Sequence, residues 1–144
     1  MSRPQPETRH QYPHFQAIPT RWMDNDVYAH VNNVVFYSFF DTAVNQYLIE
    51  QGVLDIETSH IIGLVVETKC NYFSPITFPD VVHAGLRVEK LGTSSVRYGI
   101  GLFRNDDGSA AAQGHFVHVY VDRATRKAAS VPPDMRSALE RIHA

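Results

Sequence analysis

The sequence predicts an α+β fold in which a curved five-stranded antiparallel sheet wraps one long central helix. Two observations support this prediction. Residues 34–51 follow a helical period and are apolar around most of their circumference, and such a helix must be surrounded by other structure. Most of the rest of the chain consists of strand-like segments joined by short connections, which favours an antiparallel sheet as the surrounding layer.

The chain of 144 residues is expected to form a single domain over residues 15–144, because a second hydrophobic core would be too small at this length. Residues 1–14 carry three prolines and almost no apolar side chains, so we expect a flexible segment outside the core. The first strand is expected over residues 15–21, where Pro19 indicates a sheet edge or a strand end.

The long helix begins at Val34 in this prediction. Asn32 or Asn33 can cap its start, and Gly52 can end it. Its polar side chains occupy one narrow stripe, made of Ser38, Asp41, Thr42 and Asn45. We expect this stripe to face solvent or a boundary between subunits.

Segments rich in Val, Ile, Phe and Tyr predict the remaining strands. These segments cover residues 61–72, 80–91, 95–105 and 109–122. Turn-forming residues separate them, and the Asn-Asp-Asp-Gly sequence at 105–108 indicates a hairpin. A Pro-Pro pair then precedes residues 134–143, which are expected to form a short C-terminal helix.

The composition argues against several classes of function. There are 13 Lys and Arg residues against 15 Asp and Glu residues, so a strongly basic nucleic-acid binder is disfavoured. No apolar run approaches the ~20 residues that span a bilayer, so no membrane partner is expected. The single cysteine, Cys70, cannot form an intramolecular disulfide, and no signal peptide is visible, so the cytoplasm is the expected location.

Neither a metal site nor a bound cofactor is expected. His115 and His118 are three residues apart in a predicted strand and therefore point to opposite faces of the sheet. Cys70 lies in an apolar strand, where a buried inert thiol is the common case. The chain has no Gly-x-Ser-x-Gly elbow and no glycine-rich phosphate loop, which argues against a covalent serine enzyme.

One segment carries a resemblance to a known family. Residues 21–33, Arg-Trp-Met-Asp-Asn-Asp-Val-Tyr-Ala-His-Val-Asn-Asn, precede an aromatic-rich helix and resemble the signature of the 4-hydroxybenzoyl-CoA thioesterase-like family of hot-dog-fold proteins. Further segments occur in the order that this family shows, at 72–75, 91–95 and 119–122. The resemblance spans residues 15–143. It implies a hot-dog fold and an acyl-CoA thioesterase that releases a free acid and a thiol.

Asp26 is the expected catalytic residue. Thioester hydrolysis needs a carboxylate that attacks the carbonyl or activates water, and it needs donors for the oxyanion. Asp26 lies shortly before the long helix, whose first backbone amides are unpaired and can polarise a carbonyl. The resemblance implies Asp26 as nucleophile or general base and places the polarising amide near Asn33. The alternatives are that Asp26 only caps a turn, or that Asp24 takes part in the chemistry or orients the loop.

Substrate-binding residues are expected at the helix start and in one predicted turn: His30, Asn32, Asn33, Tyr37, Thr93 and Ser95. His30 could orient the carboxylate, or it could bond the backbone of its loop. The family often has glycine at the position of Ala29, just before this histidine. Asn32 and Asn33 fit helix caps better than catalysts.

The substrate implied by the resemblance is an acyl-CoA, with acyl carrier protein as an alternative because both present the same pantetheine arm. The hydroxyls of Thr93 and Ser95 could bind the nucleotide. Arg126 and Lys127 fit either a solvated tail or contacts to the nucleotide phosphates. The acyl pocket is expected to be lined by apolar side chains such as Tyr37, Phe40, Phe73 or Ile62.

Two functions remain on this fold. One is a hydrolase with Asp26 as its acid, and the other is a non-catalytic module that binds or senses acyl-CoA. An acid at the family position favours hydrolysis, and no motif for a hydratase is present. We also expect a homo-oligomer, a dimer or a tetramer, because an open sheet leaves an unpaired edge. The resemblance implies active sites at the subunit interfaces.

Overall fold

The structure of the protein is a computed structural model that describes residues 4–144. Two short 3₁₀ helices, Arg9–Gln11 and Trp22–Asp24, flank the first strand. No helix in the described part of the chain is both long and apolar enough to cross a bilayer. The main elements are β1 (His14–Pro19), α1 (Asn33–Glu50), β2 (Ile61–Tyr72), β3 (Val81–Leu91), β4 (Ser95–Arg104), β5 (Ala112–Asp122) and α2 (Pro133–Glu140).

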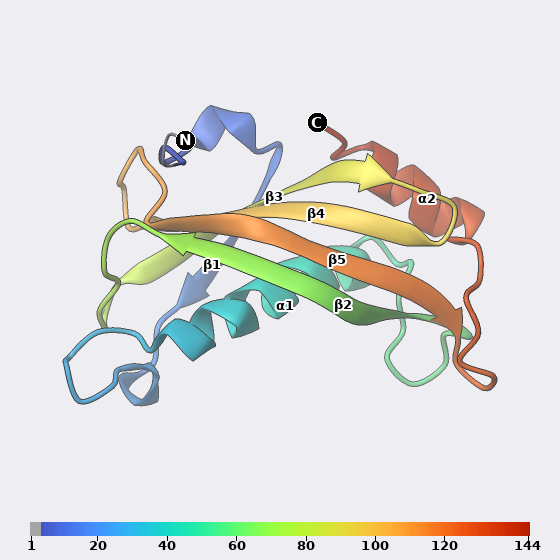
Figure 1. The fold of residues 1–144 in the computed structure, drawn as a ribbon, viewed down its shortest axis with the longest axis horizontal. Helices are drawn as coiled ribbons and strands as arrows, with labels where there is room; N and C mark the ends of the chain where they lie inside the picture. The colour runs from blue at the N-terminus through green and yellow to red at the C-terminus, as the bar shows by residue number, and fades with distance from the viewer. Residues whose placement is uncertain (1–3) are drawn as a thin grey trace.

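The strands form one antiparallel sheet in the order β1-β3-β4-β5-β2. Figure 1 shows this sheet as a curved layer with α1 along one face and α2 near one end. Each predicted strand and helix is present, with ends that differ by a few residues. The predicted α+β, hot-dog architecture is confirmed.

Local sequence sets the ends of α1. The side-chain oxygen of Asn32 accepts a hydrogen bond from the Val34 amide at 3.0 Å, so Asn32 rather than Asn33 is the cap. The chain leaves the helix through Gly52 at a φ of +73°. Phe40 is fully buried against the sheet, whereas Val34 is 67% exposed on the other side of α1. Within one chain the sheet therefore covers only one side of the helix, and the expected surrounding is incomplete.

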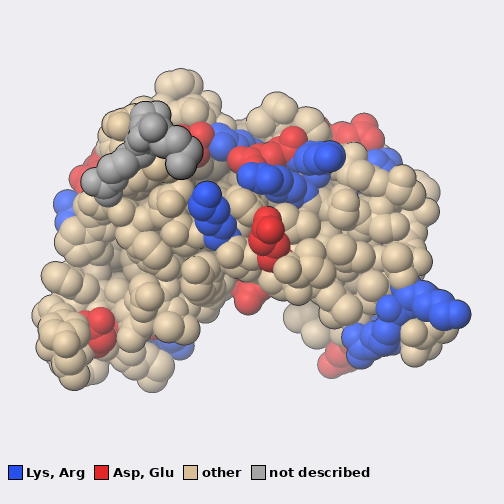
Figure 2. All heavy atoms as spheres, in the orientation of Figure 1, with Lys and Arg blue, Asp and Glu red and all other residues tan. Residues whose placement is uncertain are grey.

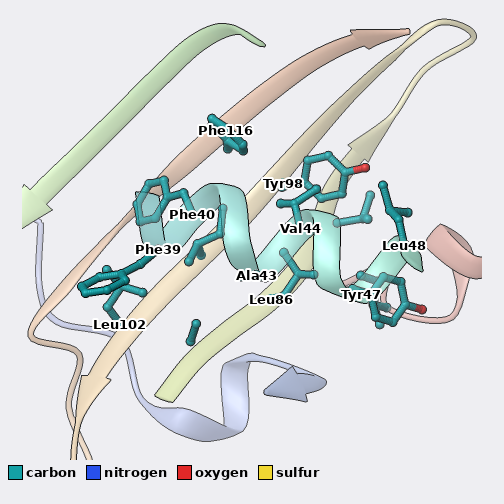
Figure 3. Close-up of a cluster of buried hydrophobic side chains, with 14 of the residues drawn as sticks. Phe39, Phe40, Ala43, Val44, Tyr47, Leu48, Leu86, Tyr98, Leu102 and Phe116 are labelled. Atoms are coloured by element: carbon teal, nitrogen blue, oxygen red, sulfur yellow. The ribbon is translucent and has the colours of Figure 1, made fainter. Parts of the chain in front are cut away.

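The core lies between α1 and the inner face of the sheet, as Figure 3 shows. Val44 of α1, Leu86 of β3 and Tyr98 of β4 are each 0% exposed there. Burial of side chains of this size stabilises the fold by roughly 1.5–3 kcal/mol each. The hydroxyls of Tyr98 and Tyr120 hydrogen-bond each other at 2.7 Å, so these buried polar atoms have a partner.

The N-terminal segment packs on the face of the sheet that points away from α1. The ring of Tyr12 fills the space above Gly85 and Gly101, where an added Cβ would come within 2.7 Å of ring atoms. Tyr12 is 4% exposed and meets Phe103 edge to face at 5.9 Å between ring centroids. The expectation that residues 1–14 stay outside the core is therefore wrong for Tyr12, because paired glycines create a slot that apolar periodicity does not reveal.

β2 is a free edge of the sheet. It pairs with β5, with a bulge between Val65 and Glu67, and no strand of residues 4–144 pairs with its other side. The apolar side chains at the middle of this edge are exposed, by 38% at Leu64, 48% at Val65 and 60% at Val66. Proteins usually blunt or cover such edges. The edge is therefore a candidate pairing surface.

His118 lies on the inner face of β5 with Phe116 and Tyr120, as the alternation of this strand predicts. Its side chain is buried, and its Nε2 atom has no hydrogen-bond partner among the described residues. Burial in these apolar surroundings lowers the pKa of His118 to about 4. The folded protein therefore keeps this imidazole neutral.

We expect the protein to lose stability in mild acid because of His118. The ordinary pKa of histidine is about 6.5, so between about pH 6.5 and pH 4 the unfolded chain binds a proton that the folded chain rejects. The free energy of unfolding keeps its full value above about pH 6.5 and decreases as the pH falls toward 4. At pH 5 the decrease due to His118 is about 2 kcal/mol. Urea unfolding of His118→Phe should therefore lose less stability between pH 7.5 and pH 5 than the parent. Burial also lowers the pKa of His14, which is present in both proteins. An equal loss of stability in both would therefore have its origin in groups other than His118 and would contradict the expectation.

Candidate active site

Asp24 fixes the loop between β1 and α1. Asp24 is 2% exposed, and its carboxylate accepts hydrogen bonds from the Arg21 amide at 2.7 Å and from Arg21 Nη2 at 2.8 Å. Its carbonyl oxygen accepts a hydrogen bond from the Asn32 amide at 2.9 Å. Asp24 thus ties the start of the loop to the helix cap. This geometry favours the loop-orienting role for Asp24 over a role in the chemistry.

Asp26 lies further along the same loop and is partly exposed. Its Oδ1 accepts a hydrogen bond from the Tyr28 amide at 2.8 Å, and its own amide donates to the His30 carbonyl at 2.8 Å. These bonds form a tight turn that holds the side chain in place. The other oxygen, Oδ2, has no hydrogen-bond partner among the described residues. One carboxylate oxygen is therefore free to meet a substrate or a water molecule.

The acid-bearing loop, the start of α1 and the end of β2 border an open cavity of about 510 Å³, a size typical of small-molecule sites. The Tyr72 hydroxyl donates to the Asn33 carbonyl at 3.1 Å and so joins the β2 and α1 walls. The ring of Phe36 meets that of Tyr72 edge to face at 5.0 Å. The cavity is lined by Asp26, His30, Val31, Asn33, Phe36, Tyr72, Phe73, Ser74 and Pro75.

This cavity combines an acid with a helix N-terminus. Asn33 is the first residue of α1 and lines the cavity together with Asp26. The first amides of a helix lack intrahelical partners and carry a partial positive charge. A carbonyl group bound in the cavity can therefore accept hydrogen bonds from the helix start while its carbon faces the carboxylate. This arrangement suits the addition of a nucleophile to a carbonyl.

A second cavity of about 640 Å³ adjoins the same acid. Trp22, Met23, Val27 and Phe78 give it apolar walls, and Asp26 lines both cavities. Trp22 is 76% exposed and Val27 is 91% exposed, which is unusual for side chains of this kind. A substrate extended on both sides of its reactive bond can therefore occupy the two cavities with that bond at Asp26.

The structure brings Asp26, His30 and Asn33 together in the first cavity, with Asn32 beside them as the helix cap. Tyr37 does not line the cavity. It is 37% exposed on the uncovered side of α1 and meets Phe40 edge to face at 6.1 Å.

Thr93 and Ser95 are not brought to the cavity within one chain. They lie at the β3–β4 turn, where the Thr93 carbonyl accepts a hydrogen bond from the Val131 amide at 2.9 Å. Arg136 of α2 also donates to the Gly92 carbonyl in this turn, at 2.7 Å. The turn thus belongs to the α2 end of the sheet, whereas the cavity lies at the start of α1.

Several lining residues were not predicted individually: Val31, Phe36, Tyr72, Ser74 and Pro75. The Tyr-Phe-Ser-Pro segment at 72–75 contributed to the resemblance, but of its four residues only Phe73 was expected to line the acyl pocket. The segment reaches the site because β2 ends beside the start of α1, and sheet topology alone produces that contact. The resemblance was the available signal.

The thiol of Cys70 lies outside the cavity and is not activated. Burial raises the pKa of the Cys70 thiol to about 11, so it stays protonated at neutral pH and is a poor nucleophile. Across residues 4–144, no group of three or more His, Cys, Asp or Glu side chains is arranged to hold a metal ion. Asp26 supplies the one carboxylate among the described residues that line this cavity.

Ala29 adopts a left-handed backbone conformation with a φ of +66°, at the position where the resembling family often has glycine. This conformation costs an L-residue roughly 1–2 kcal/mol, whereas glycine adopts it at an entropic cost of about 0.5–1 kcal/mol. We expect Ala29→Gly to raise the free energy of unfolding by up to about 1 kcal/mol, as measured by urea unfolding. Ala17→Gly, at an exposed position of β1, is the control and should lower it. A loss of stability in both variants would show that the loop is not strained.

Known proteins similar to this chain match it over most of its length. The sequence model of the thioesterase-like superfamily matches residues 20–139. The long-chain acyl-CoA thioesterase FadM of Escherichia coli (strain K12) is 26% identical over 126 residues, which is 87% of this chain and 96% of that protein. The crystal structure of the PA5185 protein from Pseudomonas aeruginosa strain PAO1 is 52% identical, with a TM-score of 0.95 and 98% of each chain covered. The PA2801 protein from Pseudomonas aeruginosa is 30% identical, with a TM-score of 0.81 over 89% of this chain and 98% of that one.

Proposed function

The chain belongs to the thioesterase-like superfamily and is a thioester hydrolase, and we propose that it cleaves acyl-CoA thioesters to a free acid and a thiol. The observation that carries this proposal is the placement of Asp26. Asp26 lines the same cavity as Asn33, the first residue of α1, and its Oδ2 has no hydrogen-bond partner among the described residues. The name of the FadM relative, a long-chain acyl-CoA thioesterase, supports the choice of substrate class.

In the proposed reaction, Asp26 acts on the thioester carbonyl while amides at the helix start, near Asn33, donate hydrogen bonds to the oxyanion. As a general base, Asp26 takes a proton from a water molecule whose oxygen attacks the carbonyl carbon. As a nucleophile, its own oxygen forms a mixed anhydride that water then hydrolyses. In both routes the carbon–sulfur bond breaks, and the sulfur takes up a proton and leaves as the thiol.

The residues around Asp26 support its role in different ways. The His30 carbonyl accepts a hydrogen bond from the Asp26 amide, and His30 lines the cavity, so we propose that His30 contacts the substrate. Asn32 fixes the start of α1, and Asn33 presents the amide. For Tyr37 we propose contact with the substrate from the uncovered side of α1.

The two cavities that adjoin Asp26 support a substrate extended on both sides of the thioester. One side takes the acyl group, and the other takes the pantetheine arm. That arm is common to CoA and acyl carrier protein. We propose CoA as the carrier, because the FadM relative is named for an acyl-CoA substrate.

We propose that the protein acts as a homo-oligomer, a dimer or a tetramer, with active sites at subunit interfaces. The free edge of β2 and its exposed Leu64, Val65 and Val66 support pairing with a second copy about a two-fold axis. Thr93 and Ser95 lie away from the cavity in one chain, so any contact of theirs with substrate requires another copy.

A thiol-release assay over a panel of acyl-CoAs of different chain length, including aryl acyl groups, tests the proposal. We expect turnover with at least one of them. The alternative is a non-catalytic module that binds or senses acyl-CoA on the same fold. Binding of acyl-CoA without release of thiol from any member of the panel would replace the hydrolase with that module.

A further inference from the structure

One backbone amide at the start of α1 has no partner, although its neighbours do. The surrounding amides all donate hydrogen bonds, at 2.7 to 3.0 Å; they belong to Val31, Asn32, Val34 and Val35. Between positions 31 and 35, the Asn33 amide alone has no partner among the described residues. Asn33 also lines the cavity that Asp26 lines. Its amide is therefore the donor that the start of α1 offers to a carbonyl oxygen bound there.

The hydroxyl of Tyr72, at the end of β2, holds Asn33 from the other wall of the cavity. It donates to the Asn33 carbonyl at 3.1 Å, and the Tyr72 ring meets the Phe36 ring edge to face at 5.0 Å. The ends of helices fray unless other groups restrain them. Here a hydrogen bond and a ring contact attach the first turn of α1 to a strand of the sheet. The hydrogen bond acts on Asn33 itself, the residue whose amide is free.

Tyr72 keeps the proton that this hydrogen bond needs. Partial burial raises the pKa of its hydroxyl, and the neighbouring Cys70 and Tyr37 raise it further. The hydroxyl therefore stays protonated at neutral pH and acts as a donor toward Asn33. Such a hydroxyl suits alignment of the helix start, whereas ready proton transfer would need a pKa nearer to the working pH.

The direction of the Asn33 amide matters because a neutral donor has to polarise a carbonyl bound in the cavity. Among the described residues, neither a Lys nor an Arg lines this cavity. In Figure 2 the surface where β2 ends and α1 begins in Figure 1 is largely free of charged side chains. Hydrogen bonds weaken steeply as the angle at the hydrogen falls below ~120°. A neutral amide therefore stabilises an oxyanion well only when it points at that oxygen.

We infer that Tyr72 is a positioning residue for hydrolysis, whose hydroxyl holds Asn33 so that the free amide points at the thioester oxygen. This inference rests on the proposed function and deepens it, because it names the group that aligns the oxyanion donor. Tyr72 acts through Asn33 and not on the reacting atoms. Loss of its hydroxyl should therefore weaken polarisation of the bound carbonyl and slow the reaction, while substrate binding stays as it is.

The first experiment removes only the hydroxyl, with Tyr72→Phe, which keeps the ring that packs on Phe36. In a thiol-release assay we expect kcat to fall ~10-fold with KM within ~2-fold of the parent value. The fall should be smaller than the ~100-fold or greater loss that follows removal of a complete oxyanion donor, because the amide remains and only its alignment is relaxed.

The second experiment measures polarisation of the carbonyl without any turnover. An acyl-CoA labelled with carbon-13 at the thioester carbonyl is bound to the Asp26→Asn variant, and its carbonyl stretch is recorded by infrared difference spectroscopy. A hydrogen bond to the carbonyl oxygen lowers this frequency relative to the free thioester in an apolar solvent. In the Asp26→Asn/Tyr72→Phe double variant we expect most of that downshift to be lost at the same occupancy of the site.

Tyr47→Phe is the matched control, at the other end of α1. The Tyr47 hydroxyl also donates to a backbone carbonyl, that of Ala138, and it lies away from the cavity. The substitution therefore deletes a hydrogen bond of the same kind from the same helix. Its urea midpoint should fall at least as much as that of Tyr72→Phe, whereas kcat of the folded protein and the carbonyl frequency should keep their parent values.

Four results would overturn the inference. They are parent kcat in Tyr72→Phe, an equal loss of kcat in Tyr47→Phe, a rise in KM at unchanged kcat, and a fall in kcat without a change in the carbonyl frequency. The third result would mean that the Tyr72 hydroxyl binds substrate directly, and the fourth that it gives a proton to the leaving sulfur. A parent protein that binds acyl-CoA but releases no thiol would reject the proposed hydrolysis instead. The infrared measurement would still decide whether Tyr72 aligns the amide in that case.

Discussion

Asp26→Asn is expected to lower the turnover number at least ~100-fold, the usual scale for loss of a positioned base. Asparagine keeps the size of the side chain, but it can neither accept the proton of an attacking water nor attack the carbonyl itself. Its amide oxygen can still accept the hydrogen bond that the Tyr28 amide donates to Asp26 Oδ1. The free energy of unfolding should therefore change by about 1 kcal/mol or less. Thiol release at saturating acyl-CoA and urea unfolding of the same preparation measure the two quantities.

Asp24→Asn is the matched control, two residues away, and should show the opposite pattern. Asp24 is buried, and its carboxylate forms an ion pair with Arg21. Loss of the carboxylate charge should therefore lower the free energy of unfolding by about 2 kcal/mol. The folded fraction should keep most of its turnover. Full activity in Asp26→Asn together with loss in folded Asp24→Asn would move the catalytic role to Asp24. Detection of an acyl adduct on Asp26 by mass spectrometry would identify the nucleophilic route.

Lysine at both Leu64 and Val66 is expected to abolish assembly and activity together. Both side chains are exposed in the single chain, so the substitutions should leave its fold intact. If two β2 edges pair, the introduced lysines of both copies come close together at the middle of the paired strands. Repulsion between these like charges opposes strand pairing. Light scattering at micromolar concentration should report a monomer in place of a dimer or tetramer, and turnover should fall at least ~100-fold with the shared site.

The control for this prediction places lysines at Gln16 and Ala17 of β1, on the other edge of the sheet. That double variant should keep the oligomeric state and most of the activity of the parent. A fully active monomer of either protein would contradict both the shared active site and the pairing of β2 edges.

The local parts of this molecule could be predicted from the sequence, and the contacts between distant segments could not. Asn32 and Gly52 define the ends of α1 through short-range chemistry, and the alternation in β5 correctly assigns Phe116 to the inner face. The resemblance pointed to an acid just before the helix, and Asp26 is close to the helix start because the two are neighbours in the chain.

The other wall of the cavity depends on strand order. Tyr72 and Ser74 meet the helix start because β2 occupies the sheet edge and ends there, a position that the hydrophobic pattern of β2 does not encode. Hydrophobic patterns likewise do not show that the β3–β4 turn, with Thr93 and Ser95, lies at the end of the sheet opposite the cavity. Predictions of residues that share a site are weakest where a long antiparallel strand separates them.

The slot above Gly85 and Gly101 couples the N-terminal segment to the sheet, so changes in one constrain the other. A methyl group at either glycine requires the space that the Tyr12 ring holds, and a smaller residue at position 12 leaves a void above both glycines. The effects of substitutions at these positions are therefore epistatic, and their stability changes will not add. A lineage that lost this N-terminal segment would have to acquire side chains on β3 and β4 in compensation, so the three positions should covary among relatives.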